Sequence, residues 1–235
     1  MLALRAQEPP PNLVRRVADR EAANAEARGH YAYRQELLME ELPGRGQPNG
    51  RYQEIRDVIF SPAGERTEQT VSQPASTLKF LRMTTEDFED IRNIQPILLT
   101  PEMLPRYEVR YRGDETVDGR DCWVLQVKPK QILQGMRLFE GTLWAEKTGL
   151  NIVRIEGQAV PPVYTRVGGE LNENLFPHFV TTRIELEGHW FPTLTSADDT
   201  LPFRNGPLHV RMTICYKDYK RFGAESKITF EEPKP

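Results

Sequence analysis

Hydrophobic and polar residues alternate along most of this chain. The clearest run is LHVRMTICY, in which Leu208, Val210, Met212, Ile214 and Tyr216 occupy every second position. A period of two is typical of a β-strand that buries one face. Comparable runs recur at short intervals and predict about ten strands. They lie at 30–42, 51–61, 65–72, 77–83, 107–112, 122–128, 138–157 (a hairpin joined at EKTG), 180–190, 208–216 and 226–232.

Two segments break the alternation with a helical period. The stretch LVRRVA (13–18) spaces its apolar residues as an amphipathic helix does, and Gly29 is the stop signal that follows it. In the second segment, 84–106, either Thr84 or Thr85 can cap a short helix with an acidic first turn. This segment is unusually apolar, so we expect it to pack on a sheet face as a lid. Its apolar residues are Phe88, Ile91, Ile94, Leu98, Leu99, Met103 and Leu104.

These elements predict a mainly β (α+β) fold. About ten strands joined by tight turns favour an antiparallel sheet, and so many strands rarely stay flat. We therefore expect a curved antiparallel sheet forming an open, incomplete β-barrel, with an N-terminal helix and a helical lid near 84–106. We expect residues 1–11 to be an N-terminal segment and residues 12–235 to form a single domain, because no linker divides them.

Composition narrows the classes of partner. The 235 residues are 38% hydrophobic and 28% charged, with a formal net charge of -3 and no basic block. We therefore do not expect a nucleic-acid partner. No apolar run approaches the roughly 18 residues that a membrane-spanning helix needs, so we expect no integral membrane segment.

Two features leave alternatives open. The start, MLALRAQEPPP, is either the tail of a secretory signal or an ordinary disordered N-terminus, since a full signal pattern is missing. Cys122 and Cys215 form one disulfide or, the interpretation we favour, remain two separate thiols.

The sequence contains no recognisable catalytic or cofactor motif. The four histidines are scattered, and the patterns of zinc proteases, nucleotide-binding loops and serine hydrolases are missing. We interpret SADDT (196–200) as a solvated turn and EDFED (86–90) as the charge cluster of a helix start, since neither has the spacing of a calcium loop. We therefore expect that the protein is not an enzyme and binds no metal or cofactor. The competing hypothesis is an enzyme that uses carboxylates for catalysis, and its activity would depend on Asp198 or Asp199.

Three stretches carry a family resemblance. VDGRDCWVLQVKPK (117–130), FEGTLWAEKTGLNIVRIEG (139–157) and EGHWFPT (187–193) resemble the LolA/LolB-like superfamily, described in bacteria as outer-membrane lipoprotein-sorting proteins. The resemblance implies an unclosed antiparallel barrel whose helices cover a cavity for acyl chains. It implies a location in the bacterial periplasm or export to the envelope. The stretch 158–178 is longer than a simple turn and departs from the superfamily.

The predicted function follows from the apolar sheet face and the resemblance. We expect a carrier or binding protein for a lipid or lipoprotein acyl chain, and the alternative is an envelope sensor or scaffold that binds a protein partner through strand edges or 158–178. Trp123, Trp144, Trp190, Phe139 and Tyr216 either line the cavity or are plain core. The residues that we expect to line the ligand cavity are Phe88, Ile91, Leu98, Leu99, Trp123, Leu125, Leu143, Val153, Ile155, Ile184, Leu186, Met212 and Ile214.

Overall fold

The computed structural model describes residues 8–42, 46–61, 65–132, 135–161, 164–167, 170–173, 177–201 and 206–221. Its helices are α1 (Leu13–Arg28), α2 (Thr85–Asn93) and the short 3-10 helix η1 (Leu104–Arg106). Its strands are β1 (Tyr31–Leu42), β2 (Gly50–Phe60), β3 (Arg66–Ser76), β4 (Tyr107–Val117), β5 (Arg120–Pro129), β6 (Leu138–Glu146), β7 (Ile152–Val160), β8 (Tyr164–Val167), β9 (Glu170–Glu173), β10 (Phe179–Leu186), β11 (His189–Leu201) and β12 (Leu208–Arg221).

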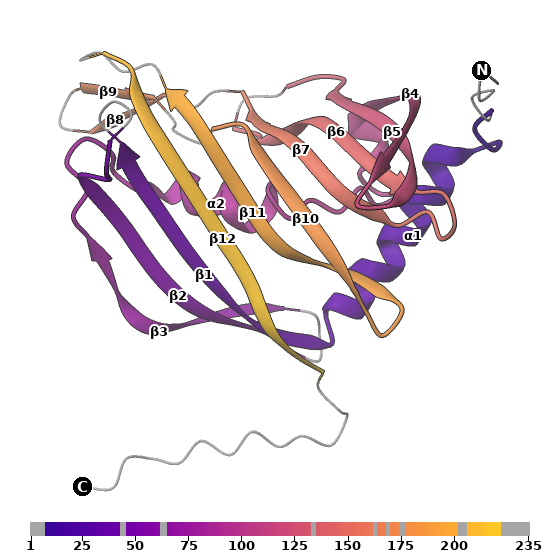
Figure 1. Cartoon of the computed structure of the whole chain (residues 1–235), viewed down its shortest axis with the longest axis horizontal. Helices are drawn as coiled ribbons and strands as arrows, with labels where there is room; N and C mark the ends of the chain where they lie inside the picture. Colours follow the sequence, from indigo (N-terminus) through magenta and orange to yellow (C-terminus); the bar gives the residue numbers. More distant parts are fainter. Residues whose placement is uncertain are drawn as a thin grey trace, which may run out of the picture.

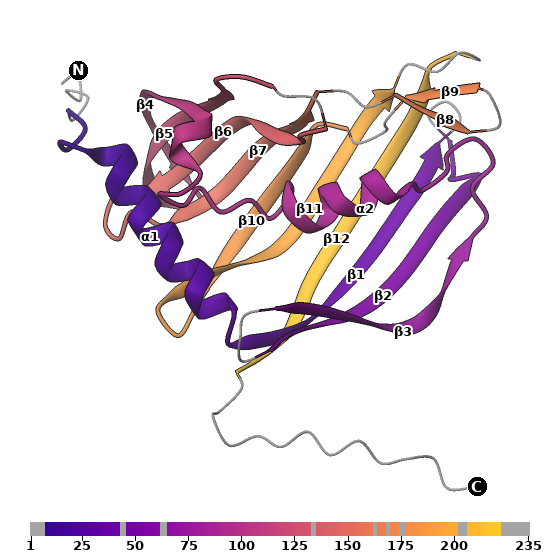
Figure 2. The same ribbon diagram turned by 180° about the vertical axis from the view of Figure 1, so that it is seen from behind.

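Ten of these strands form one curved antiparallel sheet (Figure 1). Its order is β3-β2-β1-β12-β11-β10-β7-β6-β5-β4, so β3 and β4 are its edges among the described residues and the sheet is open, as predicted. Strands β8 and β9 pair separately. Both α1 and α2 lie on the same side of the large sheet (Figure 2). We call the face that they cover the inner face and the opposite one the outer face.

Helix α1 confirms the predicted N-terminal helix. Its buried residues form one stripe: Leu13, Val17, Ala18, Glu21 and Asn24. The spacing follows the helical repeat, so a single side of the helix meets the sheet. The helix ends where predicted, and the backbone N–H of the following glycine donates to two carbonyl oxygens of the last turn. Neither α1 nor α2 is long and apolar enough to cross a membrane.

Strand β12 shows how alternation builds the inner face. Leu208, Val210, Met212, Ile214 and Tyr216 are all buried, as the pattern predicts. The residues between them are exposed or only partly buried. Burying an aliphatic side chain of this size contributes about 1.5–3 kcal/mol. This strand therefore contributes much of the hydrophobic stabilisation of the sheet.

The predicted strand at 77–83 is wrong, because this stretch is irregular. The fully buried carboxylate of Glu41 explains the difference. It accepts hydrogen bonds from the backbone nitrogens of Lys79, Phe80 and Leu81 at 2.9, 2.8 and 2.5 Å. These N–H groups are thus satisfied by a side chain from β1 instead of by a neighbouring strand.

A pair of glycines makes room for a large aromatic ring in the core. Gly141 and Gly157 lie opposite each other on β6 and β7. A Cβ on Gly141 would lie 2.5 Å from the Phe139 ring and would collide with the carbonyl oxygen of Glu156. Because neither glycine has a side chain, the fully buried ring of Phe139 can lie against the backbone.

Three further predictions need correction, and a fourth falls outside the described residues. The stretch 158–178 is not a simple loop, since it contains β8 and β9. SADDT lies within strand β11 instead of a turn. The run 180–190 is not one strand, because the turn at Glu187 and Gly188 divides it into β10 and β11. The predicted last strand, 226–232, lies outside the described residues.

Candidate ligand-binding face under the 84–106 segment

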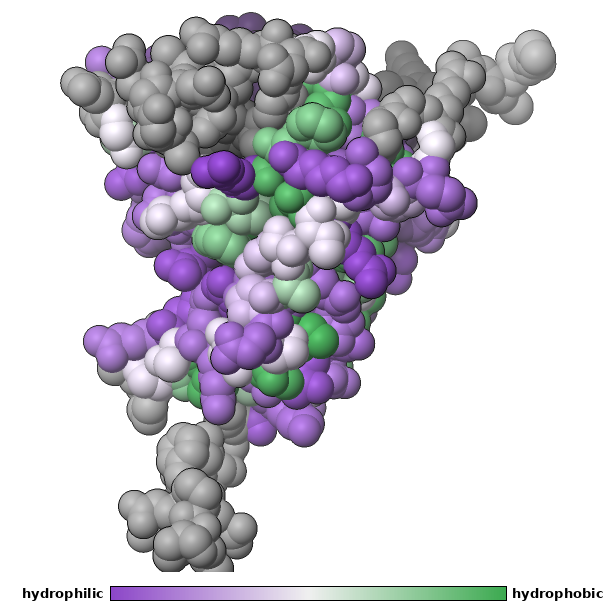
Figure 3. Space-filling view, turned by 90° about the vertical axis from the view of Figure 1, so that its left-hand side faces the viewer, coloured by the Kyte–Doolittle hydropathy of each residue, from purple (hydrophilic) through white to green (hydrophobic). Residues whose placement is uncertain are grey.

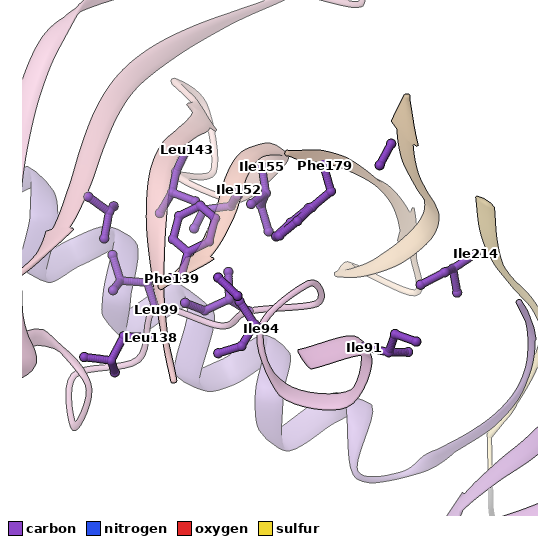
Figure 4. Close-up of a cluster of buried hydrophobic side chains, with 14 of the residues drawn as sticks. Ile91, Ile94, Leu99, Leu138, Phe139, Leu143, Ile152, Ile155, Phe179 and Ile214 are labelled. Carbon is purple, nitrogen blue, oxygen red and sulfur yellow. The ribbon is translucent and has the colours of Figure 1, made fainter. Parts of the chain in front are cut away.

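The inner face carries most of the residues that we expected to contact a ligand. Side chains from the sheet and from 84–106, which we call the lid segment, meet in one buried cluster (Figure 4). Phe88 is partly buried and packs against this cluster. The predicted residues that belong to the cluster are Ile91, Leu99, Trp123, Leu125, Leu143, Ile155, Met212 and Ile214. Contact with a ligand remains a prediction for all of them.

Four predicted residues are not in this cluster. Ile184 is 43% exposed, and Leu186 and Leu98 are partly buried. Val153 belongs to a second buried cluster with Trp144 and Trp190. By alternation from Trp123, which faces inward, this second cluster lies on the outer face. Trp144 and Trp190 are therefore core of the outer face and do not line the inner one.

Strand β10 has the opposite orientation to the one we expected, in which Ile184 and Leu186 faced the ligand cavity. Phe179, Thr181 and Arg183 are buried, whereas Val180 and Ile184 face outward. The reason is a partner far away in sequence. The guanidinium Nη1 of Arg183 donates to both carboxylate oxygens of Glu21 on α1, at 2.9 Å each, and the two side chains are 1% and 0% exposed. Once Arg183 points inward, alternation sends Ile184 out.

Arg183 also binds the lid segment. Its Nη2 donates to the backbone carbonyl of Ile97 at 2.5 Å, and Nη1 reaches the carbonyl of Ile152 on β7 at 3.5 Å. One buried cation thus connects α1, the lid segment and two strands. Sequence reasoning missed this role, because a charged residue at a strand position normally indicates the exposed face.

The rest of the lid segment is fixed at its start and its edges. Thr84 caps α2 in a capping box with Asp87, as the sequence predicted for Thr84 or Thr85. Asp90 is almost fully buried and is bonded by Arg137, which precedes β6. Arg92 donates to Glu68 on the edge strand β3 at 2.9 Å. Helix α2 is therefore amphipathic, with polar contacts at its margins and Ile91 beneath it.

Two carboxyl groups of EDFED are more buried than a solvated charge cluster would be. Burial raises the pKa of Asp87 to about 6, although its hydrogen bonds with Thr84 act in the opposite direction. Burial likewise raises the pKa of Asp90, against the effect of Arg137. Atom Oδ1 of Asp87 has no hydrogen-bond partner among the described residues. The carboxyl group therefore favours its neutral form more than an exposed aspartate does.

A row of uncharged polar groups crosses the inner face beneath the lid segment. It runs through Gln35, Tyr216, Thr195 and Thr181, on the neighbouring strands β1, β12, β11 and β10. The hydroxyls of Thr181 and Thr195 are 2.7 Å apart, and that of Thr195 is 3.3 Å from that of Tyr216. From above, the backbone carbonyl of Gln95 accepts a hydrogen bond from Thr181 at 3.0 Å. We call these four side chains the polar row.

The lid segment lies close against the sheet. A crevice between α2 and strands β1 and β2 measures about 10 Å³ and is bordered by Gln35, Leu37, Glu54, Arg56, Phe88 and Ile91. A volume of about 10–15 Å³ is the least that holds one water molecule. An acyl chain therefore does not fit this crevice until the lid segment moves.

Both cysteines are free thiols, in agreement with the interpretation that we favoured. Cys122 is buried in the outer-face cluster, and Cys215 is partly buried. Burial raises the pKa of Cys122 to about 11. Its thiol is thus protonated and unreactive at neutral pH.

Solved structures with a similar fold include three bacterial proteins. A DUF1329 family protein from Desulfovibrio piger is 16% identical, with 94% of this chain and 96% of that chain covered and a TM-score of 0.44. An outer membrane lipoprotein-sorting protein domain from Vibrio parahaemolyticus is 14% identical, with 90% and 93% covered and a TM-score of 0.40. A LolA superfamily protein from Nitrosomonas europaea is 15% identical, with 90% and 97% covered and a TM-score of 0.35.

The names of the second and third of these proteins contain the lipoprotein-sorting and LolA terms of the superfamily that residues 117–193 resemble. No protein-family model matches the chain, and no curated protein matches it in sequence. The sequence identities to these three structures are all below a fifth, and the TM-scores are all below 0.5.

Proposed function

We propose that this protein is a carrier or binding protein for a lipid or lipoprotein acyl chain, which it holds between the inner face and the lid segment. The chain belongs in the bacterial periplasm or envelope under this proposal, as the resemblance of 117–193 implies, and residues 12–235 act as one domain. The proposal includes no catalysis.

One observation carries the proposal: the inner face of an open sheet is apolar, and no second sheet covers it among the described residues. Its cover consists of α1 and the lid segment. Residues such as Leu125, Leu143, Ile155 and Met212 are fully buried, in one cluster with side chains of α1 and the lid segment. If the lid segment moved away, these residues would offer an apolar wall to a ligand.

The outer surface supports the same assignment. On the side shown in Figure 3, hydrophobic residues form small patches interrupted by hydrophilic ones. The exposed large hydrophobic residues of the described part of the chain are Val71, Phe80, Ile132, Ile184 and Leu194, of which Ile184 and Leu194 lie on the neighbouring strands β10 and β11. The buried cluster of the inner face contains many more apolar side chains than this exposed set. An acyl chain gains about 0.8 kcal/mol for each buried methylene group, so apolar walls alone give useful affinity.

One polar contact of the lid segment, at the edge of the sheet, is weak. Arg92 is 42% exposed, and its pairing with Glu68 at the sheet edge contributes little, because exposed ion pairs are worth about 0–1 kcal/mol. A ligand that fills the inner face would replace the apolar contacts of Phe88 and Ile91. Exchange of one apolar cover for another costs far less than exposing the face to water.

The test is uptake of a fluorescent diacylglycerol by the purified protein, combined with hydrogen exchange. We expect saturable binding, with exchange changing mainly in 84–106. As a control, the outward-facing variant Ile184→Ser should bind equally well. If the protein takes up no lipid and its solvent extract contains none above the level of an unrelated protein, the proposal is wrong.

The free edges favour a second candidate function. In the part of the chain that the structure describes, strands β3 and β4, of 11 residues each, have one edge that pairs with no other strand, and an exposed edge can pair with a strand of another protein. In that case the chain would be an envelope sensor or scaffold. Retention of a protein partner by lipid-free protein, lost after a proline is placed at Arg110, would favour this candidate over the carrier.

A further inference from the structure

The polar row is an unusual feature of an otherwise apolar wall. Its members are at most 5% exposed: Gln35, Thr181, Thr195 and Tyr216. They lie side by side because Gln35 is paired with Tyr216 and Thr181 with Thr195 in the strand register. Four adjacent strands thus place hydrogen-bonding groups at one level of the inner face.

One buried polar atom next to the row lacks a partner among the described residues. It is the side-chain oxygen of Gln95, whose residue is 0% exposed and whose backbone carbonyl accepts the hydrogen bond from Thr181. Leaving a buried polar group without a partner is unfavourable. A core built only for stability would have apolar side chains here, so the cost points to a role in binding.

The lid segment shows which group suits the row. In the structure, the backbone carbonyl of Gln95 accepts a hydrogen bond from the hydroxyl of Thr181. This carbonyl is an uncharged acceptor on an amide carbon. When the lid segment moves, the hydroxyl of Thr181 loses this acceptor, and a carbonyl group of the ligand can take the same place.

The cations around the row are already paired with carboxylates. Arg183, two positions along β10 from Thr181, is bonded to both carboxylate oxygens of Glu21. Arg56, at the crevice beside Gln35, pairs with Glu54 and Glu68, and Arg66 and Arg92 also pair with Glu68. Burial raises the pKa of Tyr216 to about 12, so its hydroxyl stays neutral. An anionic group at the polar row would therefore have to compete with these carboxylates for a cation, which is unfavourable.

We infer that the polar row is a recognition site for the ester or amide carbonyl of an acylated lipid, and that it discriminates against the carboxylate of a free fatty acid. This inference rests on the proposed function and adds the chemical class of the ligand. The apolar wall binds the hydrocarbon part of the acyl chain, and the polar row binds the ester or amide carbonyl group at the end of that acyl chain.

The test compares dodecane, methyl laurate and laurate as competitors of a bound fluorescent diacylglycerol, at a pH well above the pKa of laurate. We expect methyl laurate to bind at least about tenfold more tightly than laurate. The variant Thr181→Val/Thr195→Val keeps the side-chain shape and removes two hydroxyls. It should weaken methyl laurate about tenfold, because two hydrogen bonds are worth about 1–3 kcal/mol, and leave dodecane unchanged.

Two controls separate recognition from folding. Thr182→Val changes the neighbouring, outward-facing threonine of the same strand and should alter no affinity. Thr195→Ser keeps the hydroxyl and should retain most of the preference for methyl laurate. Equal binding of methyl laurate and laurate, or equal loss of all three competitors in the double variant, would overturn the inference alone. Failure of the wild-type protein to bind the diacylglycerol or any competitor would overturn the proposed function as well.

Discussion

Strands β12 and β10 belong to the same sheet and alternate equally well, but they turn opposite kinds of residue inward. Strand β12 buries Met212 and Ile214. Strand β10 buries Thr181 and Arg183 and leaves Ile184 43% exposed. The difference lies in what covers each strand. Arg183 meets the carboxylate of Glu21 on α1, whereas the buried side chains of β12 belong to the apolar cluster that the lid segment joins.

The contrast teaches that alternation gives the period of a strand but not which side is buried. Hydrophobicity decides the side where nothing else competes. A charged partner on a covering helix reverses the choice, because a buried carboxylate without a cation costs several kcal/mol. Burying the side chain of Ile184 would gain less free energy than an unpaired, buried Glu21 carboxylate would cost.

The largest effect is expected from breaking the ion pair between Arg183 on β10 and Glu21 on α1. Arg183→Met should lower the free energy of unfolding by about 3–5 kcal/mol, because Glu21 would remain buried without its partner. Denaturant unfolding measures the change. The matched control is Arg154→Met on β7, whose pair with Glu156 is about one-third exposed and should cost at most about 1 kcal/mol.

A double variant tests the interpretation of that result. Glu21→Met/Arg183→Met removes both charges and should recover much of the lost stability. If the double variant is as unstable as the sum of its two single changes, Arg183 does not act through Glu21.

An intermediate effect is expected from shortening matched isoleucines on the two strands. Ile214→Ala should cost about 2–5 kcal/mol, since it leaves a cavity at a fully buried position. Ile184→Ala, the same chemical change at an exposed position, should stay within about 0.5 kcal/mol. Similar losses at both positions in denaturant unfolding would show that the outward orientation of Ile184 is wrong.

The smallest effect is expected from a change of pH, which alters the protonation of Asp87, a buried carboxyl group of α2. Because the pKa of Asp87 is raised to about 6 in the folded protein, the folded state takes up a proton at a higher pH than the unfolded state does. The stability of the lid segment should therefore rise as the pH falls from about 7 towards 5, by on the order of 1 kcal/mol. Hydrogen exchange of the α2 amides, corrected for the intrinsic rate, measures it.

The neutral variant Asp87→Asn is the control for this pH dependence. It should remove most of the rise in protection between neutral and mildly acidic pH. A variant that keeps the full rise would assign the proton to another group, of which Asp90 is the nearest along α2 with a raised pKa.

Local signals in the sequence were sufficient for much of the fold. The helical spacing before Gly29, the cap at Thr84 and the alternation of 208–216 each depend on neighbours within a few residues, and all three predictions are confirmed. The division of 180–190 had a local signal that was missed. The pair Glu187 and Gly188, both at positive φ, is a two-residue hairpin turn.

The remaining errors have long-range causes. Residues 77–83 read as a strand, but their N–H groups are bound by Glu41, about 40 positions earlier. The orientation of Arg183 depends on Glu21, 162 positions away. A single sequence offers no spacing from which either partner could be inferred. The polar row was missed for the same reason, since its members come from four strands.

The carboxylate of Glu41 has a mechanical consequence. It fixes three successive backbone nitrogens just before α2, so the chain entering the helix is anchored to β1. At the other end, the stretch around Gln95 and Ile97 is joined to the sheet through single bonds from Thr181 and Arg183. Under the proposed function, movement of the lid segment over β10 would break the bonds to Thr181 and Arg183, whereas the bonds to Glu41 would keep the start of the segment beside β1.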